Sequence, residues 1–198
     1  MGVATGDRQI EFPAFKADRD NKGELFKESL DVMKQLWAEE FPVTQTERTN
    51  LTEGDVVPKP DFRTIPVFGT GYSSQTIEWL AEHTNGWMFY PQKLEEQKAL
   101  INKWRGLTEE FKPFTQPLML DLSERANEAP KTIEIGFRAG RNFLVDYLNA
   151  YQEAGVNHIS IGLKGSRRPA AEVIQELGEF VVPKFPVHRE QKFTFFNQ

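Results

Sequence analysis

The chain has 198 residues, of which 39% are hydrophobic and 12% aromatic, enough for a folded core rather than a disordered chain. Its 24 basic and 29 acidic residues give a net charge of −5, which argues against nucleic acid as a partner because phosphate backbones need a basic face. The absence of cysteine excludes disulfides, thiolate metal sites and a cysteine nucleophile.

The first half of the chain alternates between helix and strand patterns. Apolar residues at helical spacing predict a helix over 24–38. A polar connection with several prolines, 41–64, leads to an apolar run at 65–68 that is typical of a buried strand.

A short helix is predicted next, over roughly 74–84, with Ser73 or Ser74 as its N-cap. The sequence "GWMFY" at 86–90 indicates another buried strand. A charged helix with an apolar stripe then extends over 92–111.

The second half continues the alternation. The run "PLMLDL" at 117–122 predicts a strand, and the turn-rich segment 123–137 indicates a small hairpin appended to it. A helix over 141–154 is stopped by Gly155, and "VNHISIGL" at 156–163 indicates a further strand. Pro169 opens the last helix.

Short apolar strands that alternate with helices predict an α/β fold in which helices cover parallel strands. Two architectures fit this pattern, a doubly wound open sheet and a (β/α)8 barrel. No apolar run approaches the roughly 20 residues of a membrane span, and "MGVATGDRQIEF" lacks the features of a signal peptide. We therefore expect a cytoplasmic protein without a membrane partner.

The stretch "GTGYSS" between strand and helix suggests the dinucleotide fingerprint, which needs a third glycine and an acidic residue about 20 positions later. Ser74 replaces that glycine, and the next strand ends in Tyr-Pro-Gln, so we reject the fingerprint. Backbone N–H groups, with the hydroxyls of Ser73 and Thr76, could still hold a phosphate, and Gly69 and Gly71 would allow a close approach. The alternative is that the serines only cap the helix and the glycines only make the turn.

Three stretches, "GELFKESLDVMKQLW", "VVPKPDFRTIPVFGTGYSSQTIEWLAEHTNGWMFYP" and "GFRAGRNFLVDYLNAYQEAGVNHISIGLKGSRRPAAEVIQELGEFVVPKF", resemble the bacterial luciferase-like family of flavin-dependent oxidoreductases. The resemblance covers about 1–185, which we expect to be one partial barrel domain, and leaves 186–198 as a C-terminal tail. It implies a (β/α)8 (TIM) barrel of parallel strands with helices outside. Such a barrel binds FMN, or in some branches of the family F420, at the carboxyl ends of the strands.

The resemblance also implies which residues hold the FMN phosphate. The expected cofactor-binding residues are Thr5, Thr70, Gly71, Tyr72, Ser73 and Thr76.

By the same resemblance Gly2–Thr5 is the fourth strand, so the first three strands are missing. A complete barrel takes about 250 residues or more, and an open fragment exposes strand edges. Two copies could pair as a homodimer, the termini (including the tail "FTFFNQ") could cover the edge, or the chain could be a piece of a longer protein.

The resemblance implies an FMN-dependent monooxygenase or oxidoreductase that acts on a small organic substrate with reduced flavin and oxygen, the reduced flavin coming from a flavin reductase. The alternatives are a non-catalytic flavin-binding or structural homodimer derived from that family, or an inactive truncated fragment. No catalytic residue is predicted, since none of His83, His158 and His188 replaces the family's substrate-side histidine, and no metal-ligand spacing is present.

Four arginines, Arg138, Arg141, Arg167 and Arg168, fall in loops after the last strand regions. Because barrels often bind phosphate there, they could form a second anion site for a substrate or a cofactor tail. The alternative is that they are ordinary surface arginines. Asp121 is a charge inside an apolar strand, which could face a site or simply pair with a neighbouring arginine.

Overall fold

The computed structural model describes residues 1–186, and these divide into two compact units, Met1–Asn85 and 86–186. Most of the predicted tail, including His188, lies outside the described residues.

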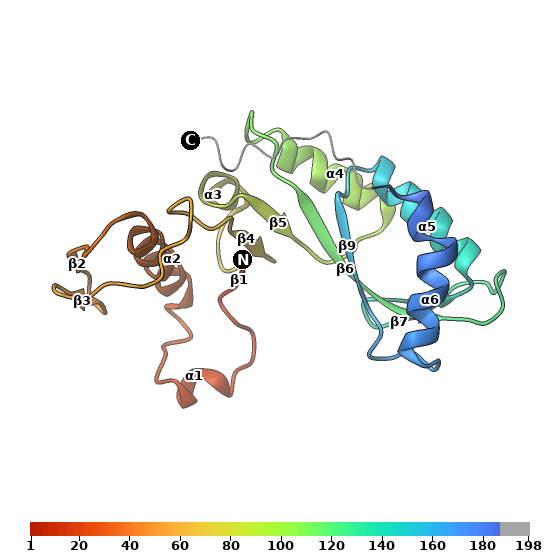
Figure 1. The fold of residues 1–198 in the computed structure, drawn as a ribbon, viewed down its shortest axis with the longest axis horizontal. Helices are drawn as coiled ribbons and strands as arrows, with labels where there is room; N and C mark the ends of the chain where they lie inside the picture. Colours follow the sequence, from red (N-terminus) through yellow and green to blue (C-terminus); the bar gives the residue numbers. More distant parts are fainter. Residues whose placement is uncertain (187–198) are drawn as a thin grey trace. The chain divides into compact units, whose positions relative to one another are not determined.

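The first unit joins a short parallel strand pair to two helices (Figure 1). Gly2 pairs with Phe68 and Val3 with Gly69, and the two helices contact each other through the rings of Phe26 and Trp79, 5.9 Å apart. Its elements are β1 (Gly2–Val3), α1 (Glu11–Ala14), α2 (Lys22–Ala38), β2 (Thr44–Gln45), β3 (Asn50–Leu51), β4 (Phe68–Thr70) and α3 (Ile77–His83).

The second unit is built around one long strand, β6 (Phe114–Leu122). Thr115 pairs with both Met88 and His158, and Met119 pairs with both Gly136 and Gly162. One edge of β6 therefore takes β5 and β8 end to end, and the other edge takes β9, all of them parallel to it. The other elements are β5 (Gly86–Met88), α4 (Leu94–Arg105), β7 (Lys131–Ile133), β8 (Gly136–Ala139), α5 (Arg141–Glu153), β9 (His158–Gly162), α6 (Ala170–Phe180) and η1 (Val182–Lys184).

The core of the second unit lies between β6 and the helices α5 and α6 (Figure 1). Alternate β6 residues, Leu118, Leu120 and Leu122, are almost fully buried against it. The helices contribute Leu144, Val173 and Leu177. Because successive strand residues point to opposite faces, Asp121 lies on the other face of the sheet, although it is also buried.

The architecture confirms the predicted α/β class with mainly parallel strands and covering helices. The described strands form open sheets, and no closed barrel forms among them. The appended hairpin is also confirmed, because β7 and β8 pair in antiparallel fashion. Trp87, fully buried, is a core residue.

Candidate functional site

The first candidate site is the loop that follows β4. Parallel strands end at the same edge of a sheet, so the loops after β1 and β4 lie next to each other. Val3 pairs with Gly69. If this register is continued by two residues along both segments, Thr5 falls opposite Gly71. The fold thus brings the most distant of the expected phosphate residues, Thr5, to the segment that holds the other five.

The loop has an unusual backbone conformation. Gly71, Ser73 and Ser74 have positive φ angles of 59°, 49° and 56°. Residues in the left-handed region next to right-handed ones turn successive N–H groups toward one concavity, which is an anion-binding arrangement. Within the described part of the chain, the N–H groups of Ser73, Ser74 and Thr76 donate to no acceptor.

The hydroxyl groups of the loop are partly committed to the protein itself. Ser73 is buried and donates to the carbonyl oxygen of Thr70 at 2.8 Å. Thr76 accepts from the N–H of Trp79 at 3.1 Å and is the N-cap of α3. The predicted caps Ser73 and Ser74 are therefore wrong, because their left-handed backbone makes the turn three residues before the helix. The loop's donors are mainly backbone N–H groups, with the proton of the Thr76 hydroxyl.

Helix α2 fixes the loop from the side. A Cβ on Gly23 would lie 3.3 Å from the Cβ and the carbonyl oxygen of Ser74, a tighter contact than most side chains make, so glycine favours this close approach. Gln75 donates through its side chain to the carbonyl oxygen of Gly23 at 2.9 Å. The loop conformation is thus held from outside, which preorganises its N–H groups.

Lys22 brings the positive charge that the loop lacks. Its Nζ donates to the carbonyl oxygen of Gly6 at 3.4 Å, and Gly6 follows Thr5. The sequence reasoning missed this residue. A cation in the first turn of a helix opposes the helix dipole, and that mismatch was the available signal.

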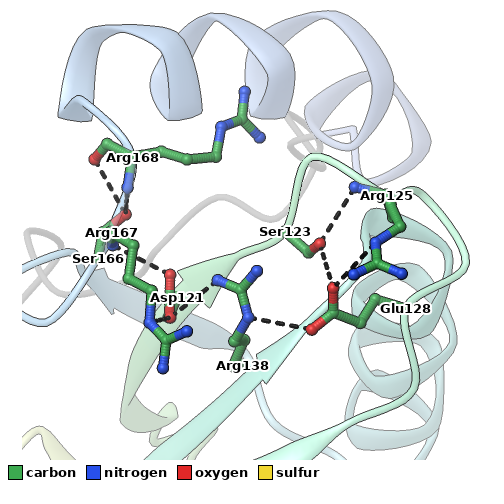
Figure 2. Close-up of polar contacts among 8 residues, drawn as sticks. All are labelled: Asp121, Ser123, Arg125, Glu128, Arg138, Ser166, Arg167 and Arg168. Carbon is green, nitrogen blue, oxygen red and sulfur yellow. Dashed lines mark hydrogen bonds and ion pairs between the residues drawn. The ribbon is translucent and has the colours of Figure 1, made fainter.

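The second candidate site lies where β6 and β9 end and where β8 presents Arg138 (Figure 2). Asp121, with a side chain only 4% exposed, is 3.0 Å from Arg138 Nη1 and 3.3 Å from Arg167 Nε. Its Oδ1 also accepts from the Arg167 N–H at 3.1 Å. The simpler prediction for Asp121, pairing with neighbouring arginines, is confirmed.

Glu128 is the second carboxylate of this network (Figure 2). It accepts from the Ser123 hydroxyl at 2.6 Å and from Arg138 Nε at 3.0 Å, and Arg125 Nε lies 3.7 Å away. The Ser123 hydrogen bond, with help from the two arginines, holds the pKa of Glu128 below its usual range. Hydrogen bonding to Asp121, and then to Glu128, raises the pKa of Arg138.

Of the four arginines singled out from the sequence, three gather here and one does not. Arg138, Arg167 and Arg168 line a hollow of about 260 Å³ together with Ser123, Glu124 and Arg125. Arg141 instead pairs with Glu176 at 3.0 Å and stacks over Phe180. Arg125 was missed, because nothing in its local sequence distinguishes it from a surface residue.

The two histidines among residues 1–186, His83 and His158, form no site there. His83 ends α3 and stacks on Trp79, and His158 is exposed at the start of β9. Among residues 1–186, no group of three or more potential ligand side chains could hold a metal ion. No helix within this range is long and apolar enough to cross a membrane.

The fold is shared with known structures at low sequence identity. It is similar to a monooxygenase, RslO1, from Streptomyces bottropensis, with a TM-score of 0.77 and 13% identity over 94% of this chain and 68% of that one. It is also similar to DmoA from Hyphomicrobium sulfonivorans, with a TM-score of 0.68 and 12% identity over 92% of this chain and 60% of that one. A third similar structure is a coenzyme F420 dependent tetrahydromethanopterin reductase from Methanopyrus kandleri. Its TM-score is 0.68, with 12% identity over 93% of this chain and 74% of that one.

These neighbours define the class of fold, luciferase-like α/β barrel proteins, of which this chain has an open part. The model of the luciferase-like monooxygenase family matches residues 1–173. The chain therefore belongs to that family, and the resemblance seen in the sequence is confirmed. No curated protein sequence matches the chain.

Proposed function

We propose that the chain binds the phosphate group of FMN in the loop after β4, and that it serves a reduced-flavin oxidoreductase acting on a small organic substrate. Membership of the luciferase-like monooxygenase family supports the reaction class. The observation that carries the cofactor proposal is the left-handed turn at Gly71, Ser73 and Ser74, in which the N–H groups of Ser73, Ser74 and Thr76 donate to no acceptor among residues 1–186. A flavin reductase and a second copy of the chain are the proposed partners.

The loop fits a phosphate in both geometry and charge. Backbone N–H groups of Ser73, Ser74 and Thr76 would donate to the phosphate oxygens, and Thr76 could add its hydroxyl proton. Thr5 and Lys22 would act from the adjoining loop and from α2. When bound, the flavin ring supplies the electron-transfer chemistry, which no side chain can provide.

A second cofactor, F420, is favoured by one specific observation. The Methanopyrus kandleri neighbour is a coenzyme F420 dependent reductase. The same loop is the proposed site for either cofactor. We propose FMN first, because the family model is that of monooxygenases.

The test compares the equilibrium binding of FMN, riboflavin and F420 to the purified chain. Charged hydrogen bonds to the phosphate should make FMN bind at least about tenfold more tightly than riboflavin. Lys22→Gln should weaken FMN binding about fivefold without changing riboflavin binding. Lys27→Gln is the matched control, because Lys27 lies on the same helix and pairs with Glu24.

Equal binding of FMN and riboflavin would overturn the proposal and leave the loop as a turn and helix cap only. F420 bound more tightly than FMN would replace the cofactor but keep the site. An equal loss of affinity in Lys22→Gln and Lys27→Gln would remove Lys22 from the phosphate site.

A further inference from the structure

The hollow in the second unit presents mostly guanidinium groups. Its lining residues are Ser123, Glu124, Arg125, Arg138, Arg167 and Arg168, and its volume is about 260 Å³. Figure 2 shows all of these residues except Glu124. Four cations face one carboxylate across this small space. We propose that this hollow binds a tetrahedral oxyanion, the phosphate or sulfonate group of a small ligand, independently of the loop proposed for FMN.

The lining of the hollow carries four arginines and one glutamate. Three buried or nearly buried carboxylates, those of Asp121, Glu128 and Glu176, make the close ion pairs of this region. They serve five arginines, because each carboxylate is shared. Glu124 is exposed at the rim, and Glu172, 60% exposed, reaches no closer than 4.0 Å to Arg168. The side chains facing the hollow therefore have more positive than negative charge.

The arginines divide into two that are mostly buried and two that are exposed. Arg138 and Arg168 have side chains only 18% and 14% exposed, and close ion pairs hold both. Arg125 and Arg167 are 87% and 76% exposed. Arg125 comes no closer than 3.7 Å to its carboxylate, too far for a hydrogen bond. The two buried guanidinium groups would position the anion, and the two exposed ones would contact it from the solvent side.

Arg168 supplies a second observation. Its Nε is buried but makes no hydrogen bond within residues 1–186. A buried donor without an acceptor is unfavourable, and its presence beside a hollow indicates an acceptor that the protein itself does not supply. An oxyanion has such acceptors on every side, and it forms bidentate contacts with guanidinium groups.

The position in the fold agrees with this inference. Ser123 follows the last residue of β6, and Arg167 and Arg168 lie in the loop after β9, which runs parallel to β6. Loops at the carboxyl ends of parallel strands are where α/β proteins bind their ligands. The hollow is small for a whole ligand, so we assign it to one charged group rather than to an entire substrate.

The experiment is a titration of the ¹⁵N-labelled chain with inorganic phosphate at constant ionic strength, followed by backbone amide shifts. We expect saturable shifts at 123–125 and 166–168, and weaker or no shifts with chloride. Glycerol phosphate and methanesulfonate, titrated in parallel, separate a phosphate ester from a sulfonate source. The amides of 71–77 report separately on the loop proposed for FMN, so failure at one site is distinguishable from failure at the other.

Two kinds of variant sharpen the result. Arg125→Gln with Arg167→Gln should weaken phosphate binding at least about tenfold, since both lost groups are exposed but close to the anion. The charge-matched control, Lys93→Gln with Lys98→Gln, removes two exposed cations of the same unit at the start of α4 and should change affinity by no more than about twofold.

Glu124→Gln removes the only carboxylate of the lining and should tighten phosphate binding by about twofold to fivefold. Glu134→Gln, an exposed glutamate outside the lining, is its control. A gain of affinity cannot come from misfolding. Absence of saturable shifts at 123–125 and 166–168 in the wild type would overturn the proposal. An equal loss in the arginine and lysine double variants would overturn it too.

Discussion

The two candidate anion sites use opposite solutions to the same physical problem. The loop after β4 offers backbone N–H groups in a left-handed turn, with one lysine beside it. The hollow after β6 offers guanidinium groups held by buried carboxylates. The first depends on backbone conformation and the second on a charge network. Substitutions should therefore act differently at the two sites.

The largest effect is expected where the second site depends on a buried charge. Asp121→Ala would leave Arg138 and Arg167 without their shared carboxylate and the Arg167 N–H without its acceptor. We expect a loss of about 3 kcal/mol in the free energy of unfolding. This is the low end of the range for removing one partner of a buried ion pair, because Arg138 still pairs with Glu128. Urea denaturation measures it.

Two further variants are the controls for Asp121→Ala. Asp121→Asn keeps an oxygen that can accept from the Arg167 N–H, so its loss should be smaller. Asp146→Ala removes an exposed carboxylate from α5 and should change stability by less than about 0.5 kcal/mol. If Asp121→Ala were as mild as Asp146→Ala, the network would not be a source of stability.

A smaller effect is expected where the first site depends on backbone conformation. Gly71 has φ of +59°, and a Cβ placed there meets no atom within 4 Å. Gly71→Ala therefore introduces no clash and adds only the penalty of a left-handed residue, about 1 kcal/mol in the free energy of unfolding. Since the turn orients the N–H groups, FMN binding should weaken with it.

Gly165→Ala is the matched control for Gly71→Ala. Gly165 also has open space around its Cβ position, but its φ is not in the left-handed region. Alanine there should be neutral or stabilise by a few tenths of a kcal/mol. If the two variants behaved alike in unfolding and in FMN binding, the left-handed turn would have no special role.

The same division explains what the sequence predicts and what it does not. The helix expected over 141–154 is observed as Arg141–Glu153, because its apolar stripe and the glycine stop are local signals. The strand expected from Pro117 begins at Phe114, because pairing on both edges of β6 overrides the proline as a start signal. The expected strand at 65–68 is observed as Phe68–Thr70, of which Phe68 and Gly69 pair with β1.

Short strands without an apolar pattern could not be predicted. β2 and β3 are two residues each, within the polar connection 41–64, and a hydrogen bond of Thr46 with Glu28 of α2 ties their turn to that helix. No local periodicity encodes a contact between residues so far apart in the chain.

The candidate sites show the same limit. The family resemblance identified the loop segment, but only the fold shows that Ser73 is committed to Thr70 and that Lys22 lies nearby. Arg125 and Arg167 are brought together by strand pairing over a long sequence separation, which sequence patterns do not reveal. The physical reason is that a site made by tertiary contacts leaves no signal in neighbouring residues.

The smallest expected effect is a pH dependence of stability that the second site has and the first lacks. The folded pKa of Glu128 lies below its ordinary value of 4.5, chiefly through the Ser123 hydrogen bond. A carboxylate with a lowered folded pKa stabilises the fold above that ordinary value, and the contribution is lost as pH falls through the folded pKa. The difference in unfolding free energy between wild type and Glu128→Gln should therefore narrow between about pH 5 and about pH 3.

Ser123→Ala removes the largest cause of the lowered Glu128 pKa but keeps the carboxylate. It should therefore partly reduce the loss of unfolding free energy on acidification. The loop after β4 has no such dependence, because Thr70–Thr76 contains no carboxylate, histidine or lysine. Acid should therefore weaken the network around the hollow while the left-handed turn keeps its N–H groups in place.

Urea denaturation from about pH 6 to about pH 3 measures this pH dependence of the unfolding free energy. A gap between wild type and Glu128→Gln that stays constant over that range would show that Glu128 pairs as strongly in the unfolded chain, and that the ion pairs do not hold the hollow together.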